Sequence, residues 1–144
     1  MPSATNTVTI ARPPGVVFAF VSDGLNAPKW RSGVLDIALV SGSGVGAEWK
    51  QGVKGPGGRR IDADYVITAY EPGRRLAFRA TAGPVRPTGD FTLEAVPEGT
   101  NLTFSLDAEL AGIKKLLMGG QVQKTMDAEV AALARLKEVV EQSD

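Results

Sequence analysis

The stretch 112-GIKKLLMGGQVQKTMDAEVAALARLKEVVEQ-142 decides the fold, because it has the pattern of one long amphipathic helix. At ~1.5 Å per residue this stretch would be roughly 45 Å long, enough to cross a small domain. Gly119-Gly120 lies within it, and each glycine weakens a helix by up to about 1 kcal/mol. We therefore expect a kink, a close backbone approach or a break at this pair. The predicted apolar stripe consists of Val122, Met126, Val130, Leu133 and Val140.

Upstream of this helix, apolar and polar residues alternate in the manner of half-buried β-strands. After the first strand, Pro14 and the apolar Val17, Phe20 and Val21 predict a short helix. A second short helix is predicted from Asn26 as N-cap to Trp30. Six further strands follow with short glycine-containing turns between them, which favours an antiparallel meander. The predicted strands cover residues 5–11, 35–40, 47–51, 61–68, 75–81, 91–95 and 102–108.

Composition indicates an ordinary globular chain and excludes several kinds of chemistry. The 144 residues fit one domain, residues 1–144, and 43% hydrophobic with 22% charged residues is typical of globular proteins. The sequence contains no cysteine, which excludes disulfides, thiolate metal sites and cysteine nucleophiles. It contains no histidine, the commonest general base near neutral pH. We therefore expect no metal and no cofactor.

Charge and hydropathy indicate which kinds of partner to expect. Lysine plus arginine and aspartate plus glutamate number 16 each, so no basic surplus is available to attract nucleic acid. The polar N-terminal residues lack the apolar core of a signal peptide, and no run of ~18 apolar residues is present. We therefore expect a cytoplasmic protein with no nucleic-acid partner and no integral membrane association.

The order of strand, two short helices, six strands and a long helix resembles the helix-grip fold of the START and birch-pollen-allergen superfamily. Within it, the chain resembles the bacterial polyketide cyclase/dehydrase and lipid-transport-like (SRPBCC) group. The resemblance covers nearly the whole chain, and five stretches carry it: VTIARPP at 8–14, VFAFVSD at 17–23, Trp30, YEPGRRLAF at 70–78 and LARLK at 133–137. It implies an α+β domain in which a seven-stranded, curved antiparallel sheet wraps around the C-terminal helix. Members include aromatase/cyclases, lipid carriers, hormone receptors and chaperone co-activators, and they share no universal catalytic motif.

This architecture usually leaves a cavity between sheet and helix, so the first hypothesis is binding of a small hydrophobic molecule such as a lipid, polyketide or sterol. Tyr65 is the polar group expected to orient the ligand, because alternation places it on an otherwise apolar face. The alternative interpretation is that the same side chains fill an ordinary core. The expected sheet wall is Trp49, Tyr65, Phe78, Phe91 and Phe104, the lid is Met118, Val122 and Met126, and Trp30 lies near one mouth.

The second hypothesis is an enzyme, a polyketide cyclase/dehydratase acting in the same cavity. It needs a buried ionisable group, yet alternation places Asp62, Asp64, Arg79 and Glu94 on the outer face. There we expect exposed cross-strand ion pairs. Two further candidates, Arg86 and Asp90, lie by the loop 83–89. A binding protein is favoured over an enzyme.

The third hypothesis is a protein-interaction module like the co-chaperone members of the superfamily, which a large exposed apolar patch would favour. The oligomeric state is open, and a homodimer is one of the alternatives.

Overall fold

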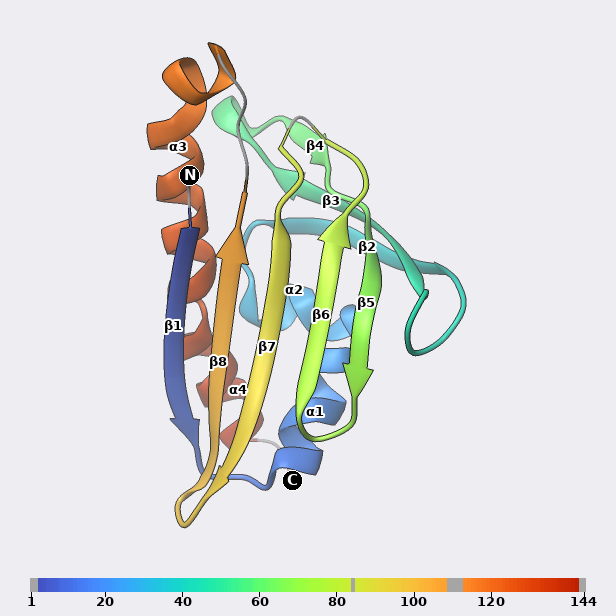
Figure 1. Cartoon of the computed structure of the whole chain (residues 1–144), viewed down its shortest axis with the longest axis vertical. Coiled ribbons are helices and arrows are strands. Elements are labelled where there is room, and N and C mark those ends of the chain that lie inside the picture. Colours follow the sequence, from blue (N-terminus) through green and yellow to red (C-terminus); the bar gives the residue numbers. More distant parts are fainter. Residues whose placement is uncertain (1–2, 84, 109–112, 143–144) are drawn as a thin grey trace.

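The computed structural model describes residues 3–83, 85–108 and 113–142, which form one curved antiparallel sheet and the helices that cover one of its faces (Figure 1). Seven strands follow each other in the order β1-β8-β7-β6-β5-β3-β2, and the short β4 pairs with β3. The strands are β1 (Ser3–Ile10), β2 (Val34–Ser41), β3 (Glu48–Lys54), β4 (Arg60–Asp62), β5 (Tyr65–Glu71), β6 (Arg75–Ala80), β7 (Thr88–Val96) and β8 (Gly99–Asp107).

The helices are arranged as the sequence predicts, with two short ones after β1 and the long ones at the end. They are α1 (Pro14–Ser22), α2 (Ala27–Trp30), α3 (Ile113–Ala131) and α4 (Leu133–Gln142), with the 3-10 turns η1 (Gly24–Asn26) and η2 (Pro56–Gly58) between them. Both α3 and α4 pack against β1, and α2 packs against α4. The predicted fold class, a helix-grip α+β architecture, is confirmed.

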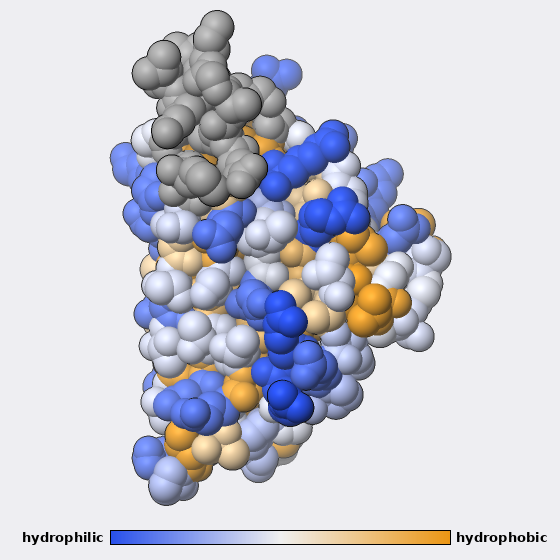
Figure 2. All heavy atoms as spheres, viewed as in Figure 1, coloured by the Kyte–Doolittle hydropathy of each residue, from blue (hydrophilic) through white to orange (hydrophobic). Residues whose placement is uncertain are grey.

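The strand β1 shows how alternation separates the two faces of the sheet. Its threonines point outward, where Thr5 and Thr7 form hydrogen bonds of 2.9 and 2.8 Å with hydroxyls on β8. Ile10 points inward and is fully buried. Figure 2 shows this outer face, where hydrophilic and neutral residues predominate and apolar residues gather toward the β2–β3 hairpin. Exposed apolar side chains at that hairpin are Leu39, Val40 and Val45.

The C-terminal helix is broken, but not where the glycine pair predicts. The helix α3 continues through Gly119 and Gly120, and no atom outside the helix lies within 4 Å of a Cβ built on Gly120. The break lies at Ala132, whose N–H is shared between the carbonyls of Ala128 and Glu129 at 3.2 Å each. A break or close approach at Gly120 was therefore a wrong prediction. The predicted apolar stripe is buried along its whole length.

The predicted strand 61–68 is in fact two strands. Ile61 belongs to β4, Tyr65 begins β5, and the chain between them leaves the ladder at Ala63 and Asp64. The Asp64 carboxylate accepts a hydrogen bond from the Gln51 N–H at 3.0 Å, and the Ala63 N–H donates to the Gln51 carbonyl at 2.8 Å. An alternating sequence hides this interruption because the apolar period continues across it.

Candidate functional site

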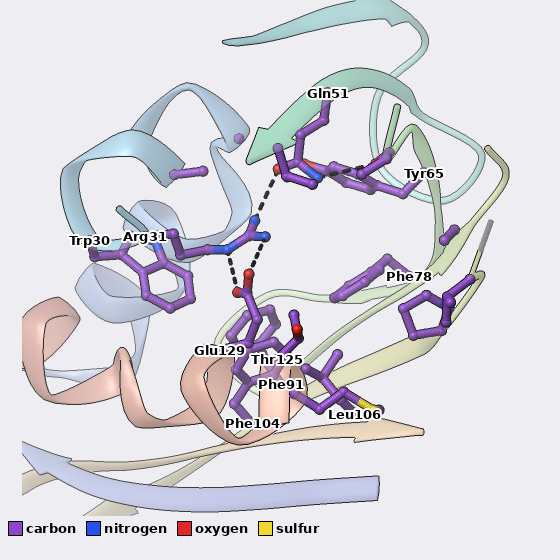
Figure 3. Close-up of a pocket in the computed structure, with 18 of the residues that line it drawn as sticks. Trp30, Arg31, Gln51, Tyr65, Phe78, Phe91, Phe104, Leu106, Thr125 and Glu129 are labelled. Atoms are coloured by element: carbon purple, nitrogen blue, oxygen red, sulfur yellow. Dashed lines mark hydrogen bonds and ion pairs between the residues drawn. The ribbon is translucent and has the colours of Figure 1, made fainter. Parts of the chain in front are cut away.

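A cavity of about 300 Å³ lies between the inner face of the sheet and α3. This is the lower end of the range for small-molecule sites, roughly 300–1,000 Å³. Most of its wall is apolar, and polar side chains occupy one side of it (Figure 3). The apolar wall includes Trp30, Ile67, Leu76, Phe78, Phe91, Phe104, Leu106, Val122 and Met126.

Aromatic rings from four elements form the centre of the apolar wall. Phe91 on β7 and Phe104 on β8 face each other across the ladder and stack with ring centroids 4.2 Å apart. Trp30, at the end of α2, meets both rings edge-on at 6.2 Å. Phe78 lies opposite Gly89, where an added Cβ would come within 2.2 Å of its ring. The glycine therefore leaves the space that the Phe78 ring occupies.

Tyr65 places a hydroxyl group at the cavity. Its ring stacks on Trp49 at 6.3 Å and contacts Phe78 at 5.4 Å. The Tyr65 Oη makes no hydrogen bond with any described residue. Every fully buried side-chain N or O of the described residues has a partner, so the Tyr65 hydroxyl is not fully buried, and Tyr65 lines the cavity. Burial raises the pKa of Tyr65 to about 12, while Arg31 lowers it and Asp23 raises it to a lesser extent.

The polar side of the wall is an ion pair extended by an amide. The Arg31 Nε and Nη2 donate to the two carboxylate oxygens of Glu129 on α3, at 2.7 and 3.2 Å. The Arg31 Nη1 donates to Gln51 Oε1 on β3 at 2.9 Å, and Gln51 Nε2 donates to the Ala63 carbonyl at 3.1 Å. Gln51 is only 4% exposed. The network thus joins α2, α3 and the sheet around the cavity (Figure 3).

The cavity opens to solvent where its lining side chains are exposed. These are Asp23, Lys54, Asp62 and Thr125. Two residues between β6 and β7, Val85 and Pro87, also line the cavity, so this connection forms part of its boundary. A ligand entering here would pass charged side chains before reaching the aromatic rings.

The structure brings together most of the residues that the sequence nominated. The cavity is lined by Trp30, Tyr65, Phe78, Phe91, Phe104, Val122 and Met126. Trp30 is 6% exposed and belongs to the inner wall, not to a mouth. Trp49 lies behind Tyr65 and is not part of the lining. Met118 lies in α3, and its side chain is outside the part of the structure that is described.

Three polar residues of the cavity wall were not predicted from the sequence: Arg31, Gln51 and Glu129. Arg31 follows the predicted short helix, Gln51 ends a predicted strand and Glu129 lies beside the apolar stripe. The Arg31–Glu129 contact joins residues 98 positions apart, and no spacing rule for one helix or strand could have found it. Gln51 alternates with Glu48 and Lys50 on the inward side of its strand, which was the one available signal.

The ionisable candidates of the sequence lie mainly outside the cavity. Arg79 and Glu94 are exposed on the sheet, with no ion pair in the described structure. Asp62 pairs with Arg60 on its own strand, and Asp90 pairs with Arg75 at 2.7 Å. Arg86 donates to the carbonyl of Gly83 at 3.4 Å. Within the described residues, no ion pair joins two of the four strand candidates Asp62, Asp64, Arg79 and Glu94.

The described residues contain neither a cluster of metal ligands nor a membrane-spanning helix. No group of three or more Asp or Glu side chains there could hold a metal ion. No helix there has the length and apolar character needed to span a membrane.

A curved antiparallel sheet that closes on a long C-terminal helix around an apolar cavity defines the helix-grip class of proteins. Within that class, the chain belongs to the polyketide cyclase/dehydrase and lipid transport family, whose sequence model matches residues 1–141.

Known proteins resemble this chain in sequence or in fold. The uncharacterized Mycobacterium tuberculosis protein Rv2574 is 30% identical over 111 residues, 74% of this chain and 65% of that protein, so the match spans less than two thirds of the relative. A START superfamily protein from Mycobacterium smegmatis shares the fold with a TM-score of 0.79 at 18% identity, over 97% of each chain. The Zhui aromatase/cyclase from Streptomyces sp. R1128 also shares the fold, with a TM-score of 0.77 at 17% identity, over 97% of this chain and 93% of the Zhui chain.

Proposed function

We propose that this protein binds a small hydrophobic molecule, of a lipid, polyketide or sterol type, in the cavity between sheet and α3. The observation that carries the proposal is an apolar cavity of about 300 Å³ bordered by the hydroxyl of Tyr65, which makes no hydrogen bond with a described residue. Burial of apolar ligand surface would supply the affinity, at roughly 25 cal/mol per Å² before the costs of association. The Tyr65 hydroxyl would orient the polar end of the ligand. The connection between β6 and β7 would admit it.

Native mass spectrometry of the freshly purified protein tests this proposal, with the denatured mass of the same sample as reference. We expect one lipophilic adduct per chain that is lost on denaturation and can be identified after extraction. An adduct-free protein that also fails to bind the neutral dye Nile red would contradict the proposal and favour a protein-interaction module.

A second candidate function is catalysis in the same cavity, as a cyclase or dehydratase of polyketide-like chains. Its support is also Tyr65, because a phenol whose pKa is about 12 stays protonated and could donate a proton to a substrate oxygen. The Tyr65→Phe variant separates the two functions. A carrier should bind a linear poly-β-ketone mimic a few-fold more weakly, whereas an enzyme should bind it normally and lose turnover.

A further inference from the structure

The polar side of the cavity carries no net charge, although it contains a full positive and a full negative charge. Glu129 meets the Arg31 guanidinium along its Nε–Nη2 edge, with both carboxylate oxygens used. The side chains are only 19% and 24% exposed. Such a pair contributes little to stability, because the cost of removing two charges from water offsets their attraction. Because stability does not account for this pair in the cavity wall, we consider its effect on ligand binding.

We infer that the Arg31–Glu129 pair makes the cavity selective for uncharged ligands, with a hydroxyl or carbonyl as their polar end, and excludes carboxylates and amines of the same shape. This inference rests on the proposed function and specifies its ligand class. A ligand carboxylate placed here would lie beside Glu129, and a ligand amine would lie beside Arg31. Either ion would lose its hydration without gaining an unpaired counter-charge.

A neutral polar end meets no such obstacle. The Tyr65 hydroxyl can donate to a ligand oxygen or accept from one, because no described residue occupies it. The Glu129 carboxylate retains acceptor capacity beyond its two bonds to Arg31. The remaining charged side chains of the lining, Asp23, Lys54 and Asp62, are exposed at the opening. Their interactions with a ligand are screened by water.

Three probes with the same two-ring body test the inference: 2-naphthol, 2-naphthoate and 2-naphthylmethylammonium. Their dissociation constants are measured by displacement of Nile red near neutral pH. For the wild-type protein we expect 2-naphthol to bind at least tenfold more tightly than either ion. Equal binding of 2-naphthol and 2-naphthoate would overturn the inference and leave the proposed function intact. Failure of all three probes and of Nile red to bind would overturn both.

Two variants make the test specific to the ion pair. Glu129→Gln keeps the shape of the side chain and leaves Arg31 without its counter-charge, so 2-naphthoate should gain about tenfold and the ammonium probe should gain nothing. Arg31→Gln should do the reverse. The matched controls Glu94→Gln and Arg79→Gln change the same charges on the exposed outer face and should retain the wild-type ranking.

Thermal unfolding of each variant establishes that it is folded before its binding is interpreted. A folded Glu129→Gln protein that still rejects 2-naphthoate would overturn the inference. If one variant fails to fold, the other variant and the wild type still test the inference. The inference predicts a different order of probe affinities for each of these proteins.

Discussion

At the scale of single residues, Tyr65 is the clearest case of a side chain whose surroundings set its chemistry. Burial raises its pKa from 10.0 to about 12, so the folded state holds the phenolic proton more tightly than the unfolded state does. The resulting stability is fully present below pH 10 and is lost as pH rises from about 10 to about 12.

This pKa predicts a difference between the wild type and Tyr65→Phe. Between about pH 10 and 12 the wild type should lose about 2 kcal/mol of unfolding free energy that the variant does not lose. The check is chemical denaturation at several pH values, together with near-ultraviolet titration of tyrosinate. A titration step near 12 should disappear in Tyr65→Phe and persist in Tyr70→Phe, which removes the only other tyrosine. If the unfolding free energies of the wild type and Tyr65→Phe fell equally between pH 10 and 12, the prediction would be contradicted.

Gly24 is the residue that lets Trp49 and Tyr65 approach the short helices. A Cβ on Gly24 would lie 2.8 Å from two atoms of the Trp49 ring and 2.9 Å from the Tyr65 hydroxyl. We therefore predict that Gly24→Ala lowers the unfolding free energy by about 1–3 kcal/mol, a typical cost of overpacking. Urea denaturation measures it.

Gly33→Ala is the matched control, because no atom lies within 4 Å of the added carbon. Its stability should stay within about 0.5 kcal/mol of the wild type, as for most surface substitutions. Equal effects of the two substitutions would show that close packing at Gly24 is not the cause.

At the scale of elements, the continuity of α3 through its glycine pair has a measurable consequence. Gly120 is exposed, lies in the helix interior and has free space around it. Replacing it with alanine should raise the unfolding free energy by about 0.5–1 kcal/mol, because alanine restricts the unfolded chain and favours the helix. A lower midpoint for Gly120→Ala in thermal unfolding would instead indicate that the helix needs a glycine at this position.

The elements themselves were largely predictable from the sequence. Alternation found the strands of the main sheet path, and helical spacing found the stripe from Val122 to Val140, because each pattern reflects one buried face. The break at Ala132 was not predictable, since alanine is the best helix former and only the tertiary packing places the break there. The separation of β4 from β5 was not predictable either, because the alternation of apolar residues continues from Ile61 to Ile67.

The candidate site was predictable only in part. Inward-facing aromatic residues such as Phe78 and Phe91 could be nominated, but a pattern of buried positions is the same for a filled core and for a wall. The Arg31–Glu129 pair depends on how α2 and α3 are placed against each other, which local patterns do not contain. The apolar wall of the cavity was therefore predictable from the sequence, and its polar wall was not.

At the scale of the whole molecule, the proposed function requires that the space between sheet and α3 holds a ligand against the aromatic rings. The five phenylalanines of the chain report on this requirement directly. Phe78, Phe91 and Phe104 line the cavity, whereas Phe18 and Phe20 on α1 do not.

The most direct measurement is NMR with phenylalanine-selective labelling, in the presence of 2-naphthol or of the natural adduct. We expect intermolecular nuclear Overhauser effects from the ligand to the rings of Phe78, Phe91 and Phe104, and none to Phe18 or Phe20. A saturable ligand that contacts only the α1 rings, or none of the five, would contradict the proposed function.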